Sequence, residues 1–281
     1  MFLTSRRPGA TGLIKALADD YITRVPDTAS IEWVCNHSRN TQLALLHGYI
    51  DIALTYERDQ ESLAATEGWS VTAGCAFHDH FCLAGPSSDP AGLRGAASLQ
   101  EGFERIAGAR ALFHSRADAS ATMWKERSIW SACGVEPWKD EDASSTWYQT
   151  SHCNPSEALT AADAAGAYLL TDRSTLLRQT ALQTIHNTTV FFEPTSPNDV
   201  LMNSCHALTP SSMSAERSIA VSNFLSYLWG RGQDVIASFG KEELGGFALF
   251  APVRDGFATV YLTGGLPRDG HWTIPSEKTK P

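Results

Sequence analysis

Four short polar loops along the chain each carry an arginine together with serine or threonine hydroxyls. Each loop runs into a stretch predicted to be helical, and the first turn of a helix offers free N–H donors and the positive end of the helix dipole. Arginine, hydroxyls and helix starts are the groups with which a protein holds an anion without a metal. The four loops are SRRPGATG at 5–12, NHSRNT at 36–41, SRADASAT at 115–122 and TDRST at 171–175.

Histidines supply the second kind of candidate chemistry. His37 and His152 lie in predicted loops, where a neutral imidazole beside an anion could act as a general base, so both are candidate catalytic residues. His78 and His80 alternate along a predicted strand, and two imidazoles on one face of a strand can bind zinc. A third ligand at motif spacing is missing, so the sequence predicts no metal site and no cofactor.

Common catalytic signatures are missing from the sequence. It contains no G-x-S-x-G, P-loop, H-E-x-x-H or G-x-G-x-x-G motif. The usual nucleophile, nucleotide-binding and zinc-protease chemistries therefore have no support in the motifs.

Composition excludes several classes of partner. The net charge of −9 argues against nucleic acid, because phosphate backbones require a basic surface. No apolar run approaches the roughly 20 residues of a membrane span. The six cysteines are scattered without a C-x-x-C pair, which favours reduced thiols over a disulfide framework or a zinc cluster. The first residues lack an apolar signal region, so we expect a cytoplasmic location, or an extracellular one if a signal was removed or omitted. The oligomeric state is not predicted.

The elements that position the loops alternate between helix and strand. Apolar spacing predicts helices over 13–22 and 41–50, and short buried strands over 31–35 and 51–56. This order predicts a parallel sheet with helices on its faces. In such doubly wound sheets ligands gather at the loops that leave the carboxyl ends of strands, where the four polar loops lie.

Two further stretches carry local predictions. The residues MWKERSIWSACG at 123–134 predict a helix with Trp124, Ile129 and Trp130 among its buried side chains. The polar run KDEDASS at 139–145 predicts a loop.

Six motifs, in order along roughly residues 5–252, resemble the tungstate- and molybdate-type anion-binding proteins of ABC importers, and more closely their fungal relatives with a PBP domain. The similarity implies an α/β, periplasmic-binding-protein-like type II fold with two lobes, a hinge and an inter-lobe cleft. Lobe I would hold residues 1–85 and 196–265, lobe II 86–195, and residues 266–281 would form a polar tail. The motifs are TGLIKALADDY, GYIDIALTY, FHDHFCLAGPSSDP, LFHSRADASATMWKE, AYLLTDRSTLL and IASFGKEELGGFALFAP.

The resemblance also implies a ligand site in the cleft. A dianion held by two arginines and several hydroxyls is physically sound, because hydrogen bonds to charged groups are the strong ones. Two alternatives stay open, an ion pair of Arg116 with Asp118 or Glu126 and a pair of Arg173 with Asp172. The implied ligand-binding residues are Thr4, Ser5, Thr11, Ser38, Thr41, Ser115, Arg116, Ser120, Thr122, Arg173 and Thr175.

The chain departs from the family at two of these loops. Relatives have a glycine-rich first loop, whereas here it reads Ser5-Arg6-Arg7-Pro8-Gly9, and His37 stands where relatives carry a small or acidic residue. The predicted function is binding of a small anion, either a tungstate- or molybdate-like oxyanion or a small organic acid, without turnover. One alternative is an intracellular enzyme that reuses the cleft, such as a cyclase, isomerase or hydrolase of a small-molecule biosynthetic pathway. Another is an inert relative whose cleft serves as an interaction surface.

Overall fold

The computed structural model describes residues 2–4, 11–25, 31–118, 120–195, 199–244, 246–254 and 257–258. The predicted tail at 266–281 lies outside the described residues. The rest divides into two compact units. The first takes the described residues of Met1–Asp79, Asn203–Gly240 and Ala248–Thr259, and the second takes those of His80–Met202 and Lys241–Phe247.

A mixed sheet organises the first unit. Strand β1 (Phe2–Thr4) pairs in parallel with both β2 (Glu32–Val34) and β3 (Ile52–Thr55), and β9 (Met202–Pro210) runs antiparallel to β3. The four residues of β3 are buried, as an apolar strand covered on both faces must be. The predicted parallel βαβ arrangement is therefore confirmed for β1, β2 and β3, while β9 adds an antiparallel neighbour.

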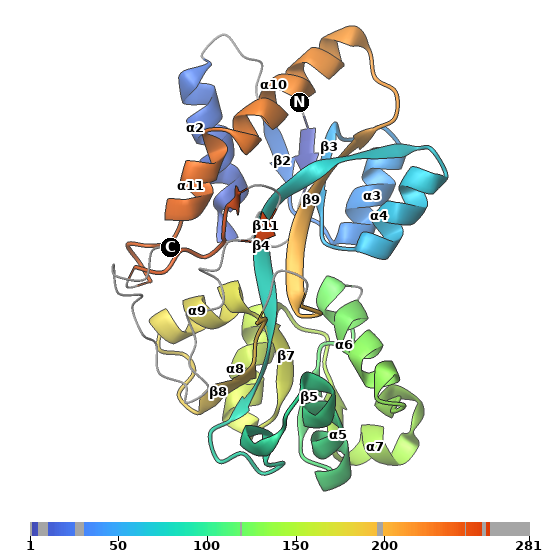
Figure 1. Cartoon of the computed structure of the whole chain (residues 1–281), viewed down its shortest axis with the longest axis vertical. Helices are drawn as coiled ribbons and strands as arrows, with labels where there is room; N and C mark the ends of the chain where they lie inside the picture. Colours follow the sequence, from blue (N-terminus) through green and yellow to red (C-terminus); the bar gives the residue numbers. More distant parts are fainter. Residues whose placement is uncertain are drawn as a thin grey trace. The chain divides into compact units, whose positions relative to one another are not determined.

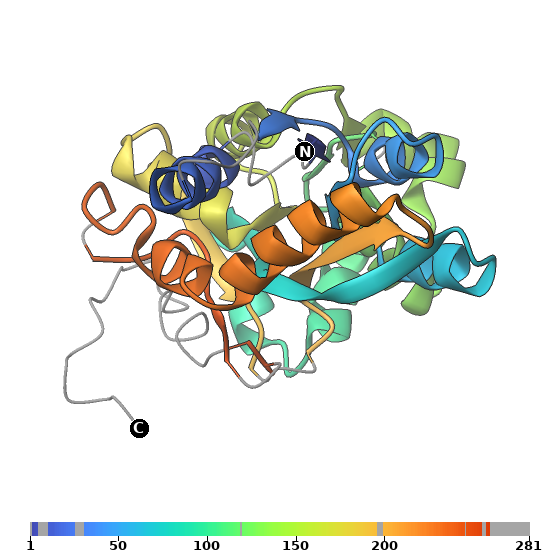
Figure 2. The same cartoon turned by 90° about the horizontal axis from the view of Figure 1, so that it is seen from above.

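Three helices of the first unit pack against one another, and Figure 2 shows them together: α2 in blue beside α10 and α11 in orange. The predicted helix at 13–22 is confirmed as α2 (Leu13–Arg24), which buries Leu13, Leu17 and Tyr21. The Tyr21 ring meets the ring of Phe224 in α10 edge-on, with 5.3 Å between their centroids. Helices α10 (Ala215–Trp229) and α11 (Gly232–Ser238) are joined in this unit by α3 (Ser38–Leu46) and α4 (Arg58–Thr66). Strand β10 (Val253–Arg254) pairs antiparallel with β11 (Phe257–Ala258).

The second unit is built around the carboxyl half of a long strand, β4 (Ser70–Pro86). Strands β7 (Leu169–Asp172) and β8 (Thr188–Phe192) both pair antiparallel with β4, while β5 (Phe113–Ser115) pairs in parallel with β6 (Tyr148–Thr150) (Figure 1). Helices surround these strands, namely α5 (Leu99–Ala109), α6 (Ala121–Ala132), α7 (Glu141–Thr146), α8 (Pro155–Ala165) and α9 (Arg173–Ala181), with 3₁₀ turns at Leu93–Gly95 and Pro137–Lys139.

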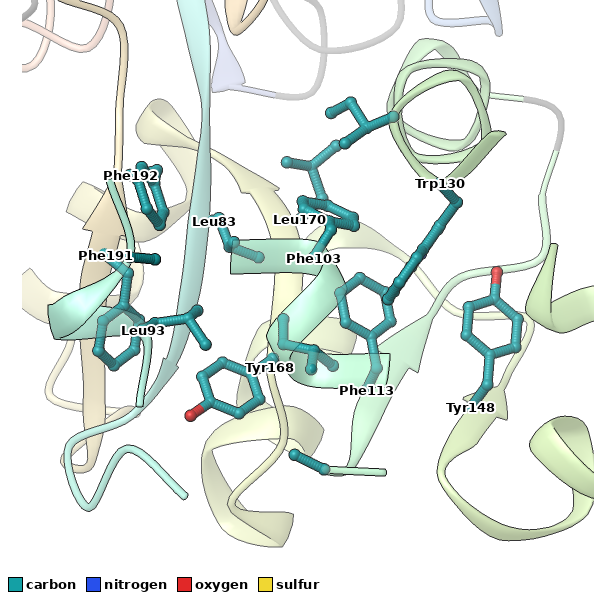
Figure 3. Packing of buried hydrophobic residues seen from close by; sticks show 14 of the residues in the cluster. Leu83, Leu93, Phe103, Phe113, Trp130, Tyr148, Tyr168, Leu170, Phe191 and Phe192 are labelled. Carbon is teal, nitrogen blue, oxygen red and sulfur yellow. The ribbon is translucent and has the colours of Figure 1, made fainter. Parts of the chain in front are cut away.

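An aromatic core fills the second unit (Figure 3). The Trp130 ring lies 4.6 Å from Phe103 and 5.2 Å from Phe113, measured between ring centroids. Phe113 also stacks on Tyr148, with 8° between the ring planes. Such rings bury large apolar areas and interlock in fixed orientations. The core therefore holds β5 and α6 in place, and with them the loop that joins them.

Two local predictions were wrong. Residues 139–145 do not form a loop, because Asp140 caps a short helix, α7, by accepting the N–H of Asp142. Trp124 is 47% exposed, whereas Trp130 on the same helix is fully buried, so only part of the predicted apolar face points inward. None of the helices in the described part of the chain combines the length and the apolar character that crossing a membrane would require.

Candidate functional site

Arg116 follows the last residue of β5, in the loop that leads to α6 (Ala121–Ala132), and only 5% of the residue is exposed. Its guanidinium pairs with Asp118, which is one of the alternatives expected from the sequence. The other oxygen of Asp118 accepts the N–H of Ser120, the N-cap of α6, at 3.0 Å. Ala117 between them has a φ of 49°, a left-handed conformation that alanine rarely adopts. The loop thus fixes a buried cation beside a helix N-terminus.

A small hollow in the second unit brings together parts of two of the predicted loops. Arg116 and Thr122 line it from the third loop, and Thr171 and Asp172 line it from the fourth. The third loop leaves the carboxyl end of β5, as predicted. The predicted loop at 171–175 is instead a direct junction, because residues 171–172 end β7 and residues 173–175 begin α9. The full lining is His114, Arg116, Thr122, Glu126, Pro155, Ala158, Leu169, Leu170, Thr171 and Asp172.

Glu126 is a member of this hollow that the sequence predicted only as a partner for Arg116. Burial raises the pKa of its carboxyl to about 7, against the lowering effect of the Tyr148 hydroxyl, which donates to Oε1 at 2.7 Å. A carboxyl with a pKa of about 7 is about half protonated at neutral pH, so it places less negative charge beside Arg116 than an ordinary glutamate would. Glu126 follows Thr122 by one helical turn, and that spacing on a single helix face was the available signal.

Ser115 lies inside the same network rather than in the lining. Its hydroxyl is 3.0 Å from the Tyr148 hydroxyl and donates to the sulfur of Met123 at 3.4 Å. Ser115 is fully buried and connects β5 to α6 within the core of the second unit.

Within the predicted fourth loop, Arg173 is the first residue of α9, and only 2% of it is exposed. Asp172 caps this helix, and its Oδ1 accepts the N–H of Thr175 at 2.8 Å and the Thr175 hydroxyl at 2.7 Å. The Thr175 hydroxyl therefore donates its proton to Asp172, the residue that caps the same helix. Burial, assisted by the charge of Arg173, lowers the pKa of His80 well below its usual value.

The predicted residues of the first two loops belong to the first unit. Ser38 begins α3, and its hydroxyl accepts the N–H of Tyr56, just beyond β3, at 3.4 Å. Thr41 is fully buried one turn later, and Thr11 is half-buried ahead of α2. Thr4 lies in β1, but its side chain and the whole of Ser5 lie outside what the structure describes.

The candidate catalytic histidines lie apart in the sequence and in different units. His37 is the N-cap residue of α3, and its backbone N–H donates to Asn36 Oδ1 at 2.9 Å. His152 is exposed between β6 and α8. His114, which no sequence motif singled out, lines the hollow instead. Its Nε2 is 2.9 Å from the Ser151 hydroxyl, and burial lowers the pKa of the ring, which favours a neutral imidazole.

The His78-x-His80 pair has two different sets of neighbours. His78 Nδ1 lies 2.7 Å from the Ser204 hydroxyl in the first unit. His80 Nε2 lies 3.4 Å from Glu193 Oε2 in the second unit. The two imidazoles therefore contact different side chains, although they alternate along one strand.

Comparison with known proteins gives one family and several relatives. The family model for the PBP superfamily domain matches residues 7–231. A Haloferax volcanii protein named as a candidate ABC transporter anion-binding protein is 38% identical over 131 residues, which are 47% of this chain and 36% of that protein. The tungstate-binding protein TupA of Campylobacter jejuni is 28% identical over 174 residues, 61% of each chain. The matched stretches thus span less than two thirds of these relatives.

A solved structure covers more of the chain. A periplasmic protein described as a candidate metal binder superposes with a TM-score of 0.80 at 30% identity, over 90% of this chain and 96% of that one. The likeness extends over both the helices and the strands described above, and it agrees with the α/β, PBP-like fold that the motifs predicted.

Proposed function

This chain belongs to the PBP superfamily domain family, and on that premise we propose that it binds a small oxyanion without turning it over. The observation that carries the proposal is Arg116, a nearly buried arginine in the loop between β5 and α6 that lines a hollow with Thr122. Relatives named as anion-binding and tungstate-binding proteins support the same class of ligand. Within that class, a tetrahedral dianion such as tungstate or molybdate is the ligand we propose first, and a small organic acid second.

The groups around Arg116 suit an anion for electrostatic reasons. A guanidinium has five N–H donors, so the pair with Asp118 holds the side chain in place and still allows hydrogen bonds to a ligand. Ser120 and Thr122 add hydroxyls at the first turn of α6, where the helix dipole favours negative charge. Arg173, at the start of α9, is a second buried cation of this unit, but it does not line the hollow. Charge-assisted bonds of this kind are roughly twice as strong as neutral ones.

Several finer expectations stay predictions. Ser38, Thr41 and Thr11 of the first unit stay candidate ligand residues, as do the closer likeness to fungal members and the closing of two lobes on a ligand. The enzyme alternative gains no particular support, because His152 is exposed and His37 serves as a backbone N-cap.

A panel of anions tests the proposal directly. A ligand that binds only the folded protein raises its melting temperature by mass action, about 2.7 kcal/mol of stability at a ligand concentration of 100 times Kd. Tungstate, molybdate, sulfate, phosphate and small carboxylates are compared at equal ionic strength, with chloride as the reference. We expect tungstate or molybdate to give the largest shift. If none of the oxyanions or carboxylates shifts the melting temperature beyond chloride, the proposal is wrong.

A further inference from the structure

Three side chains that bind metals meet in the second unit, outside the lining of the hollow. His80 and Cys82 are two residues apart on β4, and alternation along a strand places both on one face. Glu193 follows the last residue of β8, which pairs antiparallel with β4 in a register that sets Phe192 opposite Leu83. The chain leaving β8 therefore brings the Glu193 carboxylate beside the imidazole and the thiol.

The distances suit a shared ion. One ligand atom from each of the three residues lies within 4.8 Å of the other two, and His80 Nε2 is 3.4 Å from Glu193 Oε2. Bonds of about 2.0–2.3 Å to zinc in a tetrahedral site place ligand atoms roughly 3.3–3.8 Å apart. Small side-chain movements would bring all three into that range.

The three side chains lie where water has little access. His80 and Cys82 are fully buried and the Glu193 side chain is 16% exposed. Around Cys82 the packing is apolar, from Ala84, Leu159, Leu169 and Leu176 among others. In such surroundings the attraction between an ion and its charged ligands is strong, because the effective dielectric constant is low.

Charge also permits an ion at this place. The positive charge of Arg173 acts on His80, which would disfavour an added cation by itself. On binding a divalent ion the Cys82 thiol would release its proton, and the ion with one thiolate, one carboxylate and a neutral imidazole would form a centre of zero net charge. Asp172, the N-cap residue of α9, lies next to Arg173 and supplies a further carboxylate.

We propose that His80, Cys82 and Glu193 form a binding site for a divalent transition metal, with Zn²⁺ as the best match to a nitrogen, sulfur and oxygen ligand set. Water would complete a tetrahedral shell on the side where Glu193 reaches solvent. The sequence predicted no metal site, because it paired His80 with His78 and showed no third ligand. The structure instead places Cys82 and the distant residue Glu193 beside His80.

A cobalt titration tests the thiol's part. The full chain is stripped of metal and titrated with Co²⁺, whose bond to a thiolate gives a charge-transfer band and whose tetrahedral site gives intense visible bands. We expect one equivalent to bind, Zn²⁺ to displace it, and Cys82→Ser to abolish the charge-transfer band. Absence of that band in the wild-type chain would overturn the proposal.

Two matched cysteine variants control for other thiols. Cys205→Ser changes another fully buried cysteine, in the first unit, and should leave the band intact. Cys75→Ser removes the competing thiol, whose sulfur lies 3.8 Å from the His78 ring, and should also leave it intact. A band lost in Cys75→Ser and kept in Cys82→Ser would place the metal at His78 and refute the proposed site.

A measurement on the unmodified chain guards against a variant that does not fold. X-ray absorption of the one-equivalent zinc complex should show a single sulfur at about 2.3 Å, with the other ligands nitrogen or oxygen at about 2.0–2.2 Å. A shell of nitrogen and oxygen alone, or failure of zinc to bind, contradicts the proposal even if Cys82→Ser cannot be purified.

Discussion

Arg116 agrees with both interpretations of its motif, an ion pair and a residue that lines a candidate site. Its pair with Asp118 is the structural alternative that the sequence offered, yet the same side chain lines the hollow beside Thr122. The motif located this arginine, but it did not reveal the roles of Glu126, Tyr148 and His114. Those roles arise from burial, which depends on side chains from several elements, such as Phe103 of α5 and Trp130 of α6. A single sequence does not display such packing.

Glu126 should make the stability of the protein depend on pH. Its pKa is raised from 4.5 to about 7 in the folded chain, so folding takes up a proton between these values. The resulting stabilisation is complete below about pH 4.5 and is lost as the pH rises through 7. As the pH rises from 5 to 8, the free energy of unfolding should therefore fall by about 2 kcal/mol less in Glu126→Gln than in the wild type. One pKa unit is worth about 1.4 kcal/mol.

Urea unfolding at the two pH values measures this difference. Glu104→Gln on α5 changes an exposed glutamate and should leave the wild-type dependence unchanged. Glu61 in the first unit, whose pKa burial also raises to about 7, contributes a dependence of the same sign that both variants retain. Equal losses of stability in Glu126→Gln and wild type would show that Glu126 is ionised in the folded protein.

At the scale of elements, the period of apolar residues predicted the helices and short strands, because burial on one face leaves a regular pattern. The helix predicted at 13–22, observed as α2, is an example. The pattern failed for α7, which is short and exposed and is held by its Asp140 cap. It also did not show that β4 continues from Ser70 to Pro86 through both units. Helix α6 bears directly on the site, because it positions Thr122 and Glu126.

The packing of α6 can be tested with two tryptophans of one helix. Trp130 is fully buried against Phe103 and Phe113, so Trp130→Ala should lower the free energy of unfolding by about 3–5 kcal/mol. Trp124 is 47% exposed, and Trp124→Ala should cost about 1 kcal/mol or less. Chemical denaturation followed by far-ultraviolet circular dichroism gives both values. Similar costs for the two variants would contradict the orientation of α6 described here.

At the scale of the molecule, the order of six motifs identified the α/β, PBP-like fold, and the family match over residues 7–231 agrees with it. Within the described residues the units change between Asp79 and His80, between Met202 and Asn203, between Gly240 and Lys241, and between Phe247 and Ala248. The ligand was harder to predict, because a single substitution in a loop changes the hydrogen-bond donors without changing the fold. The first loop is an example, because it carries Arg6, Arg7 and Pro8 where relatives have a glycine-rich loop. These three lie outside the described residues.

Calorimetric titration of tungstate into the full chain tests most directly whether Arg116 holds an oxyanion. The wild type should bind one equivalent, and Arg116→Met should weaken binding at least tenfold, which corresponds to about 1.4 kcal/mol. Arg110→Met, an exposed arginine at the end of α5, is the matched control and should bind as the wild type does. Molybdate is titrated in parallel. Equal affinity of the wild type and Arg116→Met, with both folded, would contradict the account.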